Sequence, residues 1–207
     1  VQPVMAHTPY LNADPWRRGY GPGLLAAYRY WAWLHRQLVP YFYSLAYRMH
    51  EHPDQPVVRP GPMPDSLLIG DSIYAPIVTA SIDRMDVELP PGEWVDYWDA
   101  ARVLSGTVPG HPVPLGREPI FIRHGAVIPM HVERHYTGHG TSESAGSLTV
   151  VVYPDEAAPA SFRYRQDASS PWITFTSSVS NQRLTLTAAP QLPGQPVIYR
   201  VERWGGS

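Results

Sequence analysis

The sequence predicts a mainly β protein that carries one long helix near its N-terminal end. An amphipathic helical pattern covers residues 24–50, whereas short runs of β-branched and aromatic residues, separated by turn signals, follow Gly61. The 207 residues include 24 prolines, where an average share of about 5% would give roughly ten. Because proline breaks helices and marks turns and strand ends, this composition argues against a helical bundle.

The helical pattern begins after the Gly21–Gly23 turn and ends before Pro53, because the residue preceding a proline avoids the α conformation. One side carries an apolar stripe with spacings of four, three and four residues, made of Leu34, Leu38, Tyr41 and Leu45. Pro40 removes a backbone donor within this stripe, so we expect either a kink near residues 36–39 or two helices in tandem. The continuity of the stripe favours the kink.

Short strands are predicted for the rest of the chain. The first, residues 56–60, is an apolar run bounded by prolines. A first all-β stretch has runs at residues 72–79, 85–89, 94–98, 120–123 and 126–129, and a second has runs at 148–153, 161–164, 172–176, 183–187 and 197–203. The polar, glycine-bearing residues 133–146 between them are expected to be a linker. We expect antiparallel pairing within each stretch.

The composition excludes several classes of function. With a formal charge of -2 and dispersed Lys and Arg residues, the chain has no basic face for nucleic acid. No stretch approaches the roughly 20 apolar residues that span a bilayer, so no membrane partner is expected. The chain has no cysteine, which excludes a disulfide framework and thiolate chemistry but leaves the cellular compartment undetermined. The sequence indicates no cofactor.

Five blocks of sequence share their order and spacing with one enzyme family. They are the Pro3–His7 segment followed by Pro15-Trp16, the Leu34–Arg59 segment with its PYFYSLA and PVVRP elements, IGDSIYAPI at residues 69–77, LPPGEWVDYW at residues 89–98, and PIFIRHGAVIPM at residues 119–130. These blocks resemble the C-terminal portion of glycoside hydrolase family 31, the retaining α-glucosidases and α-xylosidases. The last block is similar to the strand pair that closes the family's proximal C-terminal domain.

The resemblance implies a domain organisation. Residues 1–60 would be the C-terminal end of a (β/α)8 catalytic barrel, with the helix in the outer ring and the strand after it as the last barrel strand. Residues 61–132 would form a proximal C-terminal β-sandwich and residues 147–207 a distal β-domain. We therefore expect the chain to begin inside a longer one. The segment between residues 60 and 69 is shorter than in the family, so the last barrel helix is predicted to be missing or vestigial.

The resemblance also implies that the parent protein hydrolyses O-glycosyl bonds of α-linked oligosaccharides. Retaining hydrolysis needs two carboxyl groups about 5 Å apart, and in the family both are aspartates on barrel strands that precede anything in this chain. Asp14 and Asp71 match neither motif and are expected to be turn residues. We therefore assign no catalytic residue; the chain would complete the barrel and support it. The alternative is a non-catalytic carbohydrate-binding or structural β-sandwich protein.

His7 is the one candidate substrate-binding residue. It falls where the family carries a histidine after a barrel strand, hydrogen-bonded to hydroxyls of the sugar in the cleaved subsite. An imidazole suits this role because one nitrogen donates while the other accepts. The preceding Met5 and Ala6 depart from the family's common Arg-x-His pattern, and a surface histidine is the alternative interpretation. Trp16 is expected to pack under the following loop rather than to cap the pocket.

Two further patterns have structural explanations. His131, His135 and His139 have the spacing of a zinc site on a helix. A proline before this segment and a glycine within it argue against a helix, so no metal site is predicted. The aromatic run at residues 94–98 could be a sugar-stacking platform, but alternate aromatics on a strand more often fill a core, which is the interpretation we favour.

Overall fold

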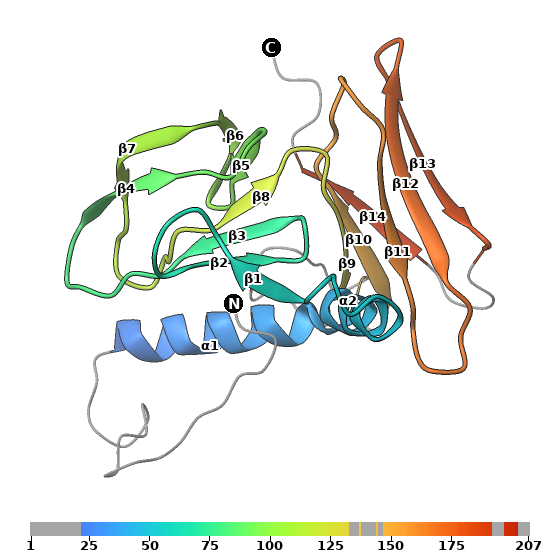
Figure 1. Ribbon diagram of the computed structural model, residues 1–207, viewed down its shortest axis with the longest axis horizontal. Helices are drawn as coiled ribbons and strands as arrows, with labels where there is room; N and C mark the ends of the chain where they lie inside the picture. Colours follow the sequence, from blue (N-terminus) through green and yellow to red (C-terminus); the bar gives the residue numbers. More distant parts are fainter. Residues whose placement is uncertain (1–21, 133–136, 138–143, 145–146, 192–196, 203–207) are drawn as a thin grey trace.

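The computed structural model describes residues 22–132, 137, 144, 147–191 and 197–202. Within these residues, two helices are followed by fourteen strands. Figure 1 shows the helices along one side of the molecule, with β1 to β8 on the left of the view and β9 to β14 on the right. The mainly β character that the sequence predicts is therefore confirmed.

The predicted helical stretch consists of two helices in tandem. α1 (Pro22–Gln37) and α2 (Val39–Glu51) meet at Leu38, and α2 turns out of the line of α1 (Figure 1). Pro40 lies in the first turn of α2, where its missing N–H costs no helical hydrogen bond and its fixed φ favours the start of a new helix. The prediction of one long, kinked helix is therefore wrong, although the break is where it was expected. All four residues of the apolar stripe are buried.

The first group of strands forms a six-stranded sheet and a two-stranded sheet, in which every pair is antiparallel. The larger sheet has the order β1-β2-β3-β8-β5-β6, and β4 pairs with β7. The strands are β1 (Val58–Pro60), β2 (Ser66–Ile69), β3 (Ile73–Pro76), β4 (Arg84–Glu88), β5 (Trp94–Asp96), β6 (Asp99–Leu104), β7 (Thr107–Pro112) and β8 (Phe121–Arg123). The predicted runs include all of these except β2, β6 and β7.

β1 is an edge strand of this sheet among the strands that the structure describes. It is hydrogen-bonded antiparallel to β2. Residues 61–65 form a tight turn, in which Asp65 has a φ of 52°, so the chain folds directly back onto β1. The role of β1 as the last strand of a catalytic barrel stays a prediction. The prediction that no barrel helix lies between residues 60 and 70 is confirmed.

The second group of strands forms two three-stranded sheets that enclose a common core. One sheet has the order β14-β10-β9 and the other β11-β12-β13, and side chains such as Val150 and Phe175 meet between them. The strands are β9 (Val127–His131), β10 (Leu148–Val152), β11 (Ala160–Tyr164), β12 (Ile173–Ser180), β13 (Arg183–Ala189) and β14 (Val197–Val201). Because β10 and β14 run parallel, the prediction of purely antiparallel strands is wrong for this pair.

The chain changes sheet between β8 and β9, before the predicted linker. β8 pairs with β3 and β5, whereas β9 pairs with β10, so β9 does not close the first β region as expected. Gly125 lies in the connection with a φ of 86°, which residues with a side chain rarely adopt. Of the expected linker at residues 133–146, the structure describes Thr137 and Ser144, and both are buried.

One hydrophobic core joins the helices to both groups of strands. It combines side chains from α1 and α2, from the six-stranded sheet and from β9 and β10. Leu45, Ile73, Ile128 and Val151 are each at most 3% exposed, and full burial of a side chain of this size contributes about 1.5–3 kcal/mol. α2 therefore lies at the junction of the two groups of strands.

Candidate functional site

The predicted sugar-binding residue lies outside the described residues. His7, Asp14 and Trp16 all belong to residues 1–21, of which the structure describes none. The assignment of His7 to a sugar subsite therefore stays a prediction.

Asp71 lies in the turn between β2 and β3, as expected, and is bound by two guanidinium groups. Its Oδ1 accepts a hydrogen bond from Nη2 of Arg59 at 2.6 Å, and its Oδ2 lies 3.4 Å from Nη1 of Arg48. Partial burial raises the pKa of Asp71, but the hydrogen bonds and charges of Arg59 and Arg48 outweigh this and hold the pKa below its usual value. A carboxyl group that stays ionised cannot protonate a leaving oxygen, so Asp71 is unsuited to acid catalysis.

A polar cleft of about 230 Å³ opens beside this ion-pair cluster. Its walls come from three elements: α2, the β2–β3 turn and β11. They carry the side chains of Arg48, Asp71, Ser72, Ser161 and Arg163, together with aromatic surface from Tyr41 and Phe162. The cleft combines charged groups, hydroxyls and an aromatic wall, which is the composition expected of a site for a polar small molecule.

The aromatic wall of the cleft is held rigidly. The rings of Tyr41 and Phe162 are stacked, with centroids 5.0 Å apart. The Tyr41 hydroxyl donates to the carbonyl oxygen of Ile69 at 3.0 Å, and burial raises the pKa of Tyr41 to about 12. Tyr41 is therefore neutral at physiological pH, and its hydroxyl is committed to the protein.

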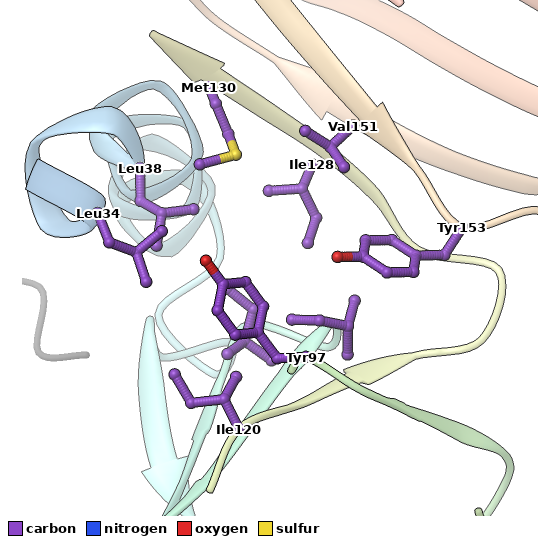
Figure 2. Close-up of a pocket in the computed structure, with 10 residues that line it drawn as sticks. Leu34, Leu38, Tyr97, Ile120, Ile128, Met130, Val151 and Tyr153 are labelled. Carbon is purple, nitrogen blue, oxygen red and sulfur yellow. The ribbon is translucent and has the colours of Figure 1, made fainter. Parts of the chain in front are cut away.

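A second cavity lies inside the main core. Leu34 of α1 and Leu38, at the break between α1 and α2, line it together with residues of the two groups of strands. Figure 2 shows the Tyr97 and Tyr153 rings turned toward it among aliphatic side chains. Its volume is about 20 Å³, whereas one water molecule needs about 10–15 Å³. The Tyr97 hydroxyl is already hydrogen-bonded to the Tyr30 hydroxyl at 2.6 Å. This cavity holds at most about one water molecule and cannot hold a sugar.

The aromatic residues at 94–98 belong to packed regions. Trp94 is fully buried and its Nε1 donates to the carbonyl oxygen of Pro90 at 2.8 Å. Trp98 packs against Tyr30 and Trp31 of α1, and the Arg117 guanidinium lies 5.5 Å from its ring centroid. The interpretation of this run as core is confirmed for Trp94, and the Trp98 ring joins α1 to the six-stranded sheet instead of offering a free platform.

Two kinds of site, a cluster of metal ligands and a membrane-spanning helix, were sought in the described part of the chain. Among the described residues, no group of three His, Asp or Glu side chains could hold a metal ion. His131 is described and lies exposed at the end of β9, whereas His135 and His139 fall outside the described residues, so the prediction about that histidine triplet stays a prediction. Neither described helix is long and apolar enough to cross a membrane.

The residues of the cleft have no local sequence signal. Arg48, Asp71 and Phe162 come from three distant segments, and tertiary packing alone brings them together. The site could be predicted only if α2 and β11 were expected to be neighbours. The sequence instead predicts them in separate domains.

Comparisons with known proteins identify what this fold belongs to. Residues 45–128 match the family model described as the glycosyl hydrolase family 31 C-terminal domain. Alpha-glucosidase 2 of Bacillus thermoamyloliquefaciens is 29% identical over 188 residues, covering 77% of this chain and 24% of that protein. The alpha-xylosidase of Saccharolobus solfataricus is 30% identical over 142 residues, covering 61% of this chain and 19% of that protein.

A solved structure shows the same fold. The cycloalternan-forming enzyme from Listeria monocytogenes, in complex with a pentasaccharide substrate, superposes with a TM-score of 0.72 at 22% identity, over 87% of this chain and 19% of that enzyme. The chain thus spans about a quarter or less of the length of the proteins that it resembles.

The fold and these matches define the class: a C-terminal β region of the kind found in glycosidase-family proteins. The resemblance of the chain to the C-terminal portion of glycoside hydrolase family 31 is confirmed.

Proposed function

We propose that this chain is the C-terminal part of a retaining α-glycosidase. In the whole protein it completes the (β/α)8 barrel, supplies His7 to the sugar subsite and supports the barrel with its two β regions. The reaction is hydrolysis of an O-glycosyl bond in an α-linked oligosaccharide or glycoside. The two catalytic carboxyl groups come from the rest of the barrel.

The observation that carries this proposal is the incompletely covered apolar surface of α1. Six large side chains lie in α1 before Leu34, and none of them is fully buried by the rest of the chain. They are Leu24, Leu25, Tyr28, Tyr30, Trp31 and Trp33. From Leu34 onward the stripe is buried against the β regions. Because these side chains keep part of their surface accessible, the N-terminal half of α1 can pack against another part of the protein.

The length of the relatives supports a barrel as the partner of α1. The chain spans 24% of the Bacillus alpha-glucosidase 2 and 19% of the Listeria enzyme, so in those proteins most of the polypeptide lies elsewhere. In a (β/α)8 barrel the outer helices cover the strands and pack on neighbouring helices. α1 is proposed to occupy such a position, with its N-terminal half against the preceding barrel helices.

His7 is proposed to bind substrate and not to react with it. A neutral imidazole donates one hydrogen bond and accepts another, so it can bind two hydroxyls of the sugar that is cleaved. Each such bond contributes about 0.5–1.5 kcal/mol, and two of them correspond to a roughly 10- to 100-fold change in kcat/KM. The chemistry itself would remain possible without His7.

The test is an activity assay on the longest natural polypeptide that contains this chain. 4-Nitrophenyl α-glucoside and α-xyloside are the substrates, and His7→Ala is compared with the control His131→Ala, whose side chain is exposed at the end of β9. We expect turnover of at least one substrate, a roughly 10- to 100-fold lower kcat/KM for His7→Ala, and no change for His131→Ala. Absence of turnover on both substrates contradicts the proposal and favours a non-catalytic carbohydrate-binding or structural role. Equal activity of both variants contradicts the role of His7.

A further inference from the structure

The polar cleft beside α2 has no part in the proposed catalytic function. Its volume of about 230 Å³ is more than ten times the roughly 10–15 Å³ that one water molecule needs. Its mouth is bordered by exposed positions, Ser161 and Arg163 of β11 and Asp71 of the β2–β3 turn. A molecule of several polar groups can therefore enter it from solvent.

Arg48 has hydrogen-bonding capacity left over in this cleft. Its Nη1 faces Asp71, but its Nε is buried and has no hydrogen-bond partner among the described residues. The buried Nε is closed to a ligand in the open cleft, but the guanidinium that lines the cleft carries further N–H donors besides the Nη1 that faces Asp71. Arg48 can therefore donate to accepting oxygens of a bound molecule.

The cleft is lined by charged side chains of both signs, two arginines and one aspartate. Asp71 lies between Arg48 and Arg59 and stays ionised, so it offers accepting oxygens and repels phosphate or carboxylate groups. The Arg163 guanidinium lies 4.5 Å from the centroid of the Trp172 ring, which directs it toward that ring. The cleft thus presents donors and acceptors together. Hydroxyl groups, which both donate and accept, match this mixture.

The shape of the cleft favours a compact ligand over an added peptide strand. β11 is the edge strand of its sheet among the described strands, and an edge can accept a peptide when it is free along its length. Here α2 blocks the edge, because the Arg165 backbone N–H, directly after β11, donates to Ser44 Oγ of α2 at 3.0 Å. The stacked Tyr41 and Phe162 rings form one wall of the cleft. A ring-sized molecule fits this enclosure.

The walls of the cleft are held in place before any ligand binds. Arg165, in the loop after β11, donates from Nη2 to the carbonyl oxygen of Ala168 at 2.8 Å. Its Nη1 lies 3.5 Å from Oε1 of Glu51 in α2. Trp172 donates from Nε1 to the same Glu51 carboxylate at 2.9 Å. These contacts connect α2 to the β11–β12 loop. A preformed site binds with a smaller entropic cost than one that must be ordered.

We propose that this cleft is a non-catalytic binding site for one glycosyl unit of an oligosaccharide. Arg48 and Asp71 would bind adjacent hydroxyls, the serine hydroxyls would add further hydrogen bonds, and Phe162 would contact the apolar part of the ring. The choice of α-linked glucose as the glycosyl unit rests on the proposed function. The cleft and its mixture of hydrogen-bond donors and acceptors do not.

The experiment is calorimetric titration of isomaltotriose and maltotriose into the longest natural polypeptide that contains the chain. Ser161→Tyr fills the mouth of the cleft from an exposed strand position, and Thr185→Tyr makes the same change at an exposed position of β13. Arg48→Lys keeps the charge beside Asp71 but removes the planar guanidinium and its additional N–H donors. Thermal melts identify any variant that fails to fold, and kcat/KM on 4-nitrophenyl α-glucoside is measured in parallel.

We expect two classes of binding site in the unmodified protein. The class assigned to the cleft should weaken at least tenfold in Ser161→Tyr and in Arg48→Lys, with no change in Thr185→Tyr and none in kcat/KM on the small substrate. Binding that is equal in Ser161→Tyr and Thr185→Tyr overturns the proposal, as does a cleft that binds inorganic phosphate in preference to both sugars. Loss of turnover with cleft binding intact would instead contradict the proposed catalytic function alone.

Discussion

Replacement of Gly70 by alanine tests how closely α2 packs on the turn between β2 and β3. Gly70 has a φ of +56°, and a Cβ built there would lie 2.5 Å from the Tyr41 hydroxyl oxygen and 2.9 Å from Cδ1 of Leu45. Tyr41 and Leu45 are both buried core residues of α2. Neither can move away from the new methyl group without disturbing the core.

Two contributions set the size of the effect. A left-handed backbone conformation costs a residue other than glycine about 1–2 kcal/mol, and an added methyl group in a packed core typically costs about 1–3 kcal/mol. The free energy of unfolding should therefore fall by about 2–5 kcal/mol in Gly70→Ala. For a chain of this length, that change lowers Tm by roughly 4–20 °C.

Gly106→Ala is the matched control for backbone strain. Gly106 has a φ of +64°, but nothing lies within 4 Å of a Cβ built on it, so it should lose only the roughly 1–2 kcal/mol of the backbone term. Both variants are measured by thermal and urea unfolding, and the difference between them reports the contact of the turn with α2. Equal destabilisation by the two substitutions would refute the packing described here.

Three further predictions concern other regions. Burial lowers the pKa of His111, so as pH falls below about 6.5 the unfolded chain takes up a proton before the folded chain does, and the free energy of unfolding falls. His111→Gln should reduce this loss of stability in thermal melts between pH 7.5 and 5. An unchanged pH dependence of Tm would contradict the prediction. Arg165→Ala removes the contacts of Arg165 with Ala168 and Glu51 and should lower the free energy of unfolding by about 1–3 kcal/mol. The control Arg183→Ala, at the exposed first residue of β13, should change it by close to zero. The isolated 207-residue chain should oligomerise or aggregate through α1, and a clean monomer in light scattering contradicts that.

Local patterns in the sequence predict much of this fold. The stripe from Leu34 to Leu45 predicts the buried helix face, because a helix must repeat its apolar residues every three or four positions to bury one side. Runs rich in valine, isoleucine and aromatic residues likewise predict strands such as β5 and β10. β6 and β7 lack this signal: β6 contains two alanines, and β7 contains glycine and two prolines. Their pairing partners, and not their own composition, make them strands.

Local sequence patterns do not determine which strands pair with one another. Leu148–Val152 is strand-like in any sheet, but its pairing with β9 and β14 depends on how the chain returns from distant segments. The same holds for the cleft, where Arg48 and Phe162 meet only because α2 lies at the junction of the two β groups. The domain boundary proposed from the sequence separates these two residues. For this reason the sequence does not predict the cleft, and the one site residue that it does predict, His7, lies outside the described residues.

The proposed function requires that this chain supplies part of a catalytic barrel and none of its reactive carboxyl groups. The most direct measurement is the rate of 4-nitrophenyl α-glucoside hydrolysis by the 207-residue chain alone, compared at equal molar concentration with the longest natural polypeptide that contains it. We expect turnover by the longer polypeptide and a rate for the isolated chain equal to the uncatalysed background. Turnover by the isolated chain would contradict the proposed function.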